Sequence, residues 1–206
     1  MTTKHRVLQV ATVAFADRGV AGTSLDGLAA ELGVTKQTIL YHFGSKGRLI
    51  ESVLAQAAAD LAAELEDAVA GAEPGWPKVE SVVRASFGLA VRRPELLGVL
   101  RETSRLGSPW SESALDLLQP LIDRAIRALD EGVDKGYFRS VDPRLTLVSA
   151  YAVVSGAVTD PELLRAVGLQ LDLRTAAELR RTLLSFLQVA LGVPPNSLRR
   201  DRQGKS

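Results

Sequence analysis

The chain has 206 residues, of which 46% are hydrophobic and 24% charged, and its formal net charge is +1. This composition is typical of a globular protein with a core of ordinary size, in one large domain or two small ones. The chain contains no cysteine, which excludes disulfide bonds and thiolate metal sites. Because no segment resembles a signal peptide or an apolar membrane span, we expect a cytoplasmic protein.

The charges are distributed unevenly. Residues 1–50 contain six Lys and Arg against three Asp and Glu, residues 51–198 contain fifteen against twenty, and residues 199–206 contain four against one. A modestly basic amino-terminal segment on an acidic body fits a protein that presents one end to a polyanion.

The first predicted helix runs from about His5 to Arg18, and residues 1–4 are expected to be disordered. Residues 23–46 then predict two short helices joined by a tight turn. Thr23 or Ser24 caps the first of these helices, and Gly33 supplies the left-handed backbone at the turn. Thr35 caps the second. This is the helix-turn-helix pattern, whose second helix is built to lie in the major groove of DNA, although the same geometry also occurs in structural helical bundles.

The outer face of the second helix carries side chains that suit DNA. Lys36 and Gln37 are expected to reach base edges, while Thr23, Tyr41 and Lys46 are expected to contact phosphates. The full set of candidate DNA-binding residues is Thr23, Thr35, Lys36, Gln37, Thr38, Tyr41, His42 and Lys46.

The segment GVTKQTILYHFGSK, from Gly33 to Lys46, resembles the amino-terminal signature of TetR-family transcriptional repressors. The preceding run VLQVATVAFADRGVAGTSLDGLA is similar to the first helix of that family and its approach to the motif. The resemblance covers about residues 6–55. It departs from the family at Leu40, where an aromatic residue is common, and leucine cannot donate a hydrogen bond to a phosphate. The resemblance implies a helical body that encloses an effector site.

After the motif, Ser45 is expected to cap a long helix to about Ala70, followed by a linker rich in Gly and Pro. Further helices are predicted at about 77–93, 94–105, 111–135, 143–159 and 175–191, with one helical turn near 163–167. No strand is predicted, so the fold class is all-α, with a three-helix head and a larger helical body. Because the long helix joins the two, we expect it to be the only route by which the body displaces the head.

The predicted helix at 143–159 is apolar or small on almost every side, with no charge between Arg144 and Asp160. Such a helix must be buried on every side, and in a chain of this length the simplest explanation is that a second copy of the chain covers its remaining side. We therefore expect a homodimer in which this helix and the last one meet their counterparts. The expected interface residues are Ser149, Tyr151, Ala152, Ser155, Gly156, Leu183 and Leu187.

The effector pocket that the resemblance implies has mostly apolar candidate residues, with Arg101 or Glu102 as a polar anchor. The set is Phe87, Leu96, Leu100, Arg101, Trp110, Leu118 and Ile122. The alternative for each residue is ordinary core for the apolar members and solvated surface for Arg101 and Glu102. Trp110, in a loop-like segment, is expected to be a lid or an interface residue. An aliphatic lining favours an apolar or amphipathic effector over a sugar or a nucleotide.

No arrangement of residues predicts catalysis. His5 and His42 are the only histidines, and neither a metal-ligand spacing nor a nucleophile or phosphate-loop motif occurs, so we expect no enzyme, metal or cofactor. We expect a homodimeric repressor, with a DNA-binding domain at 1–50, an effector-binding and dimerisation domain at 51–198 and a flexible basic tail at 199–206. It should bind a double-stranded DNA operator and a small-molecule effector. The alternative is a helical adaptor protein that does not bind specific DNA.

Overall fold

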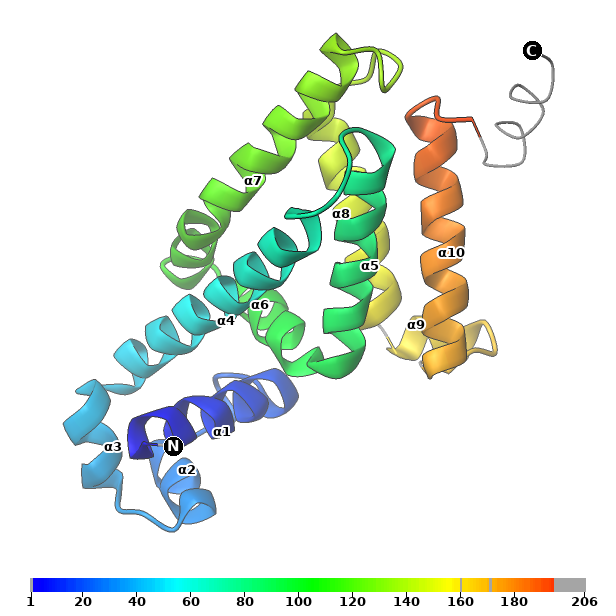
Figure 1. The fold of residues 1–206 in the computed structure, drawn as a ribbon. Coiled ribbons are helices and arrows are strands. Elements are labelled where there is room, and N and C mark those ends of the chain that lie inside the picture. Colours follow the sequence, from blue (N-terminus) through cyan, green and yellow to red (C-terminus); the bar gives the residue numbers. More distant parts are fainter. Residues whose placement is uncertain (1, 160, 171, 195–206) are drawn as a thin grey trace, which may run out of the picture. The chain divides into compact units, whose positions relative to one another are not determined.

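The computed structural model of the chain describes residues 2–159, 161–170 and 172–194, without the side chains of residues 103–104, 154–159 and 161–163. Every regular element in these residues is a helix, which confirms the all-α fold class (Figure 1). The helices are α1 (Thr3–Arg18), α2 (Leu25–Leu32), α3 (Lys36–Phe43), α4 (Lys46–Val69), α5 (Trp76–Arg92), α6 (Pro94–Leu106), α7 (Trp110–Asp134), α8 (Pro143–Thr159), α9 (Pro161–Ala166) and α10 (Leu173–Ala190).

These bounds agree with the predicted helices to within a few residues, except at the amino terminus. The prediction of disorder through residue 4 is wrong, because Thr2 caps α1 by accepting a hydrogen bond from the His5 backbone N–H. In the described part of the chain no helix is long and apolar enough to cross a membrane. The predicted basic tail lies outside the described residues.

The chain divides into two compact units. The first contains the described residues up to Ala63 together with Arg92–Pro120, and the second contains Glu64–Val91 together with the described residues from Leu121 on. The division therefore does not follow the boundary predicted after residue 50, because α6 and the start of α7 pack with the amino-terminal helices. The functional roles assigned to the two segments stay predictions.

The first unit has one hydrophobic core, built from α1 to α4 and extended by two later helices. Phe15, Leu28, Ile39 and Leu49 are among the side chains that are almost wholly buried there. Val99 of α6 and Ala114 of α7 belong to the same core. Burial of this apolar surface stabilises the amino-terminal helices by excluding water, so they share their stability with α6.

Helix α6 lies directly against α1 within the first unit. A Cβ added at Gly98 would stand 2.9 Å from the Cβ of Ala16, so the two helices cross with only one methyl group between them. The carboxylate of Glu102 accepts a hydrogen bond of 3.3 Å from the Val20 backbone N–H, just beyond the end of α1. The expectation that the long helix is the only route to the head is therefore wrong, since α6 contacts α1 as well.

In the second unit α8 packs against α10, and α10 turns its apolar stripe toward the interior of the chain. Leu183 is 2% exposed and Leu187 is 7% exposed. Their assignment to a dimer interface is corrected, because side chains already buried in one protomer have almost no area left to bury against another. Ser149, Tyr151 and Ala152 are exposed, and the side chains of Ser155 and Gly156 lie outside the described part.

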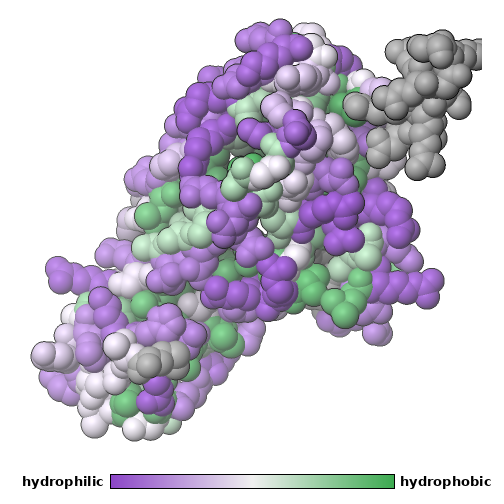
Figure 2. Space-filling view, in the orientation of Figure 1, coloured by the Kyte–Doolittle hydropathy of each residue, from purple (hydrophilic) through white to green (hydrophobic). Residues whose placement is uncertain are grey.

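The α8–α10 pair carries large apolar side chains at its surface. They are Leu145, Val148, Tyr151 and Val153 of α8 and Leu173, Phe186 and Val189 of α10. Figure 2 shows one face of the molecule, on which hydrophobic residues reach the surface among hydrophilic ones. Monomeric proteins rarely leave so many large apolar side chains exposed on neighbouring helices, so this pair is a candidate interaction surface.

Exchanging the two residues at the α1–α6 crossing tests the packing of the first unit. We expect Gly98→Ala to overpack the crossing and Ala16→Gly to leave a gap. The double variant restores a single methyl group, so it should be more stable than the two separate changes predict, by about 1–2 kcal/mol. Urea unfolding followed by circular dichroism measures the four proteins. Gly71→Ala is the control, because a Cβ there meets nothing within 4 Å. Additive changes in the free energy of unfolding at positions 16 and 98 would contradict the close contact of the two helices.

Candidate nucleic-acid interface

The helix-turn-helix is held by caps and a left-handed glycine. Ser24, and not Thr23, caps α2 by accepting a hydrogen bond of 3.0 Å from Gly27 N–H. Gly33 adopts φ 66° and ψ 33°, a conformation that costs glycine little and other residues more. Thr35 caps α3 by accepting from Thr38 N–H at 3.1 Å. These local bonds fix where α2 ends and where α3 begins (Figure 1).

The inner and outer faces of α3 are clearly separated. Ile39 and Phe43 are buried in the core of the first unit, while Gln37 is exposed and Tyr41 is 86% exposed. The hydroxyl groups of Thr35 and Thr38 are 2.9 Å apart and share a hydrogen bond. Among the described residues neither Gln37 nor Tyr41 has a hydrogen-bond partner for its side chain, so both can bond to a partner outside the chain.

Lys36 stands at the start of α3 and pairs with a carboxylate of α2. Its Nζ lies 2.8 Å from Oδ2 of Asp26, and both side chains remain substantially exposed. His42 is half-buried and its ring meets the rings of Tyr41 and Phe43 edge to face. Packing accounts for His42, whereas Lys36 keeps two further N–H donors for another acceptor.

Thr23 has a structural role. Its side chain is buried, and its hydroxyl lies within hydrogen-bonding distance of the carbonyl oxygens of Ala14, at 3.2 Å, and Gly19, at 2.8 Å. The predicted phosphate contact is therefore corrected, because a hydroxyl buried against α1 cannot meet a phosphate without opening the core. Thr23 instead fixes the turn that carries the chain from α1 into α2.

Lys46 is also occupied inside the first unit. The Lys46 Nζ donates a hydrogen bond of 2.6 Å to the Val20 carbonyl oxygen. The backbone N–H of Val20 in turn donates to the Glu102 carboxylate. Both backbone groups of Val20 are thus held by charged side chains, one from α4 and one from α6. This arrangement gives Lys46 and Glu102 roles in positioning the α1–α2 turn, in place of the roles predicted for them as a phosphate ligand and an effector anchor.

Arg48 is the candidate that sequence reasoning missed. It lies in the first turn of α4, where its backbone N–H donates to the capping hydroxyl of Ser45. Its exposed side chain passes the end of α3, with Nη1 3.7 Å from the position of a Cβ on Gly44. No acceptor for its guanidinium occurs in the described part of the chain. A free cation immediately after a recognition helix is a signal for a phosphate contact.

The residues predicted to line an effector pocket do not gather in one unit. Leu96, Leu100, Arg101, Trp110 and Leu118 belong to the first unit, and Phe87 and Ile122 belong to the second. Leu100 and Trp110 pack against the core of the first unit. The indole of Trp110 lies beside Gly47, 3.3 Å from the position of a Cβ there. Trp110 was expected to be a lid or an interface residue, and its packing contradicts the lid, whereas the interface role stays a prediction. Leu118 and Ile122 are half-buried, Phe87 and Leu96 are buried, and Arg101 is exposed.

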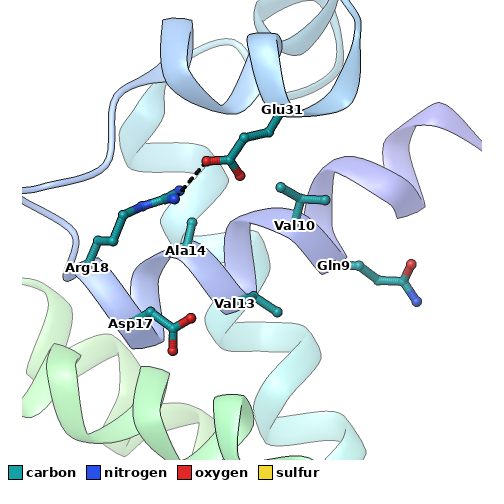
Figure 3. A pocket seen from close by; sticks show the side chains of 7 residues that line it. All are labelled: Gln9, Val10, Val13, Ala14, Asp17, Arg18 and Glu31. Carbon is teal, nitrogen blue, oxygen red and sulfur yellow. Dashed lines mark ion pairs between the residues drawn. The ribbon is translucent and has the colours of Figure 1, made fainter.

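A shallow depression of about 330 Å³ lies between α1 and α2 (Figure 3). Its floor is formed by Val10, Val13 and Ala14, and the ion pair between Arg18 and Glu31, at 2.7 Å, closes one side. The depression is open to solvent and belongs to the first unit, so it is not the predicted effector pocket. Within the described residues no cluster of His, Asp and Glu could hold a metal ion.

Known proteins share both the motif and the fold. The family described as "Bacterial regulatory proteins, tetR family" matches residues 7–53. An HTH-type transcriptional repressor of Streptomyces coelicolor is 43% identical over 60 residues, which are 29% of this chain and 31% of that protein. The matched segment thus spans about a third of that relative.

Two solved structures resemble the whole chain in fold. The transcriptional regulator FadR from Bacillus subtilis, in complex with stearoyl-CoA, has a TM-score of 0.76 at 17% identity, over 93% of this chain and 99% of that one. AibR, in complex with isovaleryl coenzyme A and operator DNA, has a TM-score of 0.75 at 19% identity, over 89% and 96%. At this level of identity the likeness is one of fold.

Proposed function

The chain belongs to the TetR family of transcriptional regulators, and we propose that it is a homodimeric repressor that leaves its operator when a small molecule binds. The observation that carries the DNA-binding part is the outer face of α3. This face is exposed and polar on a helix whose start, end and inner face are fixed by caps and core packing. Such a rigid helix can enter the major groove without losing the structure that supports it.

The exposed side chains suggest a division of labour at the DNA. Gln37 projects from the first turn of α3, where a carboxamide can bond to the edge of adenine. Tyr41 and Arg48 lie farther along, at the end of α3 and the start of α4, where they suit phosphates. In this proposal Lys36 and Gln37 choose the sequence, and Arg48 makes the phosphate contact that was predicted for Lys46.

This division predicts different losses for two single changes. The first step is to select a binding site from a pool of random duplexes with the full-length protein. Gln37→Ala should then cost about 1–3 kcal/mol on the selected site and relax specificity at one position. Arg48→Ala should weaken binding to every sequence and lower the slope of log K against log salt by about 0.9. Fluorescence anisotropy measures both, and equal losses from both changes on selected and random DNA would refute the division.

The homodimer is supported by the surface of the α8–α10 pair. Leu145, Val148 and Ala152 recur at helical spacing on the exposed side of α8, and Phe186 and Val189 are exposed on α10. An isologous contact between two such surfaces would bury apolar area on both protomers at once. A dimer also offers two recognition helices to one DNA, whose successive major grooves are about 34 Å apart.

A charge on this surface should break the dimer. Val189→Glu would bury an unpaired carboxylate in the contact, so we expect a monomer that keeps the helical content of the wild type. Val13→Glu is the matched control, because it makes the same change at an exposed valine of α1. Sedimentation at micromolar concentration distinguishes the species. A wild-type protein that sediments as a monomer there would exclude the proposed interface.

The effector that we propose is apolar or amphipathic. Leu118, in the first unit, remains a candidate lining residue, because it is half-buried and so partly open to a ligand. Structures similar in fold hold stearoyl-CoA or isovaleryl coenzyme A, so acyl thioesters are suitable first compounds. Because α6 contacts α1 at Gly98 and at Glu102, a ligand that moves α6 would move the turn at Val20. The loss of operator affinity cannot exceed the ratio of the ligand's affinities for the DNA-free and DNA-bound conformations of the protein.

We expect acyl thioesters to weaken operator binding by about 5- to 150-fold, the usual range of coupling between two sites. Leu118→Trp, which enlarges a residue proposed to line the effector site, should leave operator affinity intact but make it insensitive to the ligand. Anisotropy titrations with isovaleryl and stearoyl thioesters of coenzyme A, each against free coenzyme A, measure the effect. If no acyl chain length changes the affinity of the wild type, the release mechanism proposed for these ligands is wrong.

A further inference from the structure

The ion pair between Asp26 and Lys36 joins the two helices of the helix-turn-helix on their solvent side. The Lys36 Nζ and the Asp26 Oδ2 are 2.8 Å apart, and the side chains are 49% and 69% exposed. The pair is therefore formed in the free protein yet remains within reach of an incoming polyanion. The ion pair engages Lys36, which is the first residue of α3 and which we propose for a base contact.

The position of each partner explains the pair. Asp26 is in the first turn of α2, where the helix dipole favours a negative charge. Lys36 is the first residue of α3, where the dipole disfavours a positive charge, so the nearby carboxylate compensates it. Because both groups are exposed, the pair is weak and a better acceptor can replace the carboxylate.

We propose that Asp26 is a specificity-determining residue, which holds Lys36 in complexes with random DNA and yields it only to a matching base edge. A guanine offers two acceptors, O6 and N7, in a geometry that a lysine can reach in the major groove. A loosely docked complex offers Lys36 a single phosphate, which gains little over the carboxylate it already has. This inference rests on the proposed DNA binding and adds a residue that does not itself contact DNA.

Removing the carboxylate should therefore act mainly on random DNA. In Asp26→Asn, Lys36 is free to neutralise one more phosphate and release one more counterion. We expect the slope of log K against log salt on random DNA to steepen by about 0.9, and binding to tighten roughly fivefold at about 0.1 M salt. On the selected site Lys36 is already committed to a base, so the slope should not change there and the affinity should change less. The ratio of selected to random affinity should fall.

Two further variants separate this role from a change in net charge. Glu31→Gln removes one negative charge from the same helix and breaks the comparable ion pair with Arg18, which lies against α1. Because Arg18 is the last residue of α1 and not part of α3, we expect this variant to leave the random-DNA slope unchanged. Lys36→Gln removes the side chain that Asp26 restrains, so adding Asp26→Asn to it should produce no further change. Thermal unfolding checks that all variants fold.

Anisotropy titrations of the full-length proteins over a range of salt decide the question. A steeper random-DNA slope in Asp26→Asn alone, abolished by Lys36→Gln, supports the inference. An unchanged slope, an equal change in Glu31→Gln, or an effect that persists without Lys36 would overturn it. If the wild type selects no sequence from the random pool, the proposed repressor function fails instead.

Discussion

The hydrophobic core of the first unit is the constraint on which the rest of the structure depends. Helix α3 buries Ile39 and Phe43 in this core and packs Leu40 against it, and a helix of eight residues would not be stable without the core. The core also contains Val99 of α6, so the helices of the helix-turn-helix share their packing with a helix far along the chain. A change in the position of α6 is therefore felt by the head through direct contact, at Gly98 and Ala16, as well as through α4.

Polar contacts refine this packing and leave few charges unused. The Arg6 guanidinium donates to the Leu32 carbonyl at the end of α2, Arg18 pairs with Glu31, and Lys46 binds Val20. Much of the positive charge in the head is thus committed to holding helices together. A basic segment is consequently a poor guide to the number of phosphate contacts, and the exposure and partners of each cation decide which ones can meet DNA.

The helices could be predicted from the sequence because their signals are local. Apolar spacing, the Thr35 cap and the left-handed Gly33 lie within a few residues of the structure that they specify. The roles of Thr23, Lys46 and Glu102 could not be predicted from the sequence, because their hydrogen-bond partners are backbone carbonyl or N–H groups 4 to 82 residues away. The stripe of Leu183 and Leu187 was recognised as buried, but periodicity does not tell whether the cover is the same chain or a second copy. Arg48 was overlooked because its significance lies in a guanidinium for which the described residues offer no acceptor, and a sequence pattern does not show this.

Hydroxyl-radical footprinting of the full-length wild type on its selected site tests the central claim most directly. Two recognition helices presented by one homodimer should protect two groups of sugars, centred about one helical turn apart and related by symmetry. Addition of an acyl thioester that releases the protein should remove both groups together. A single protected group, or protection without any sequence preference, would contradict the account.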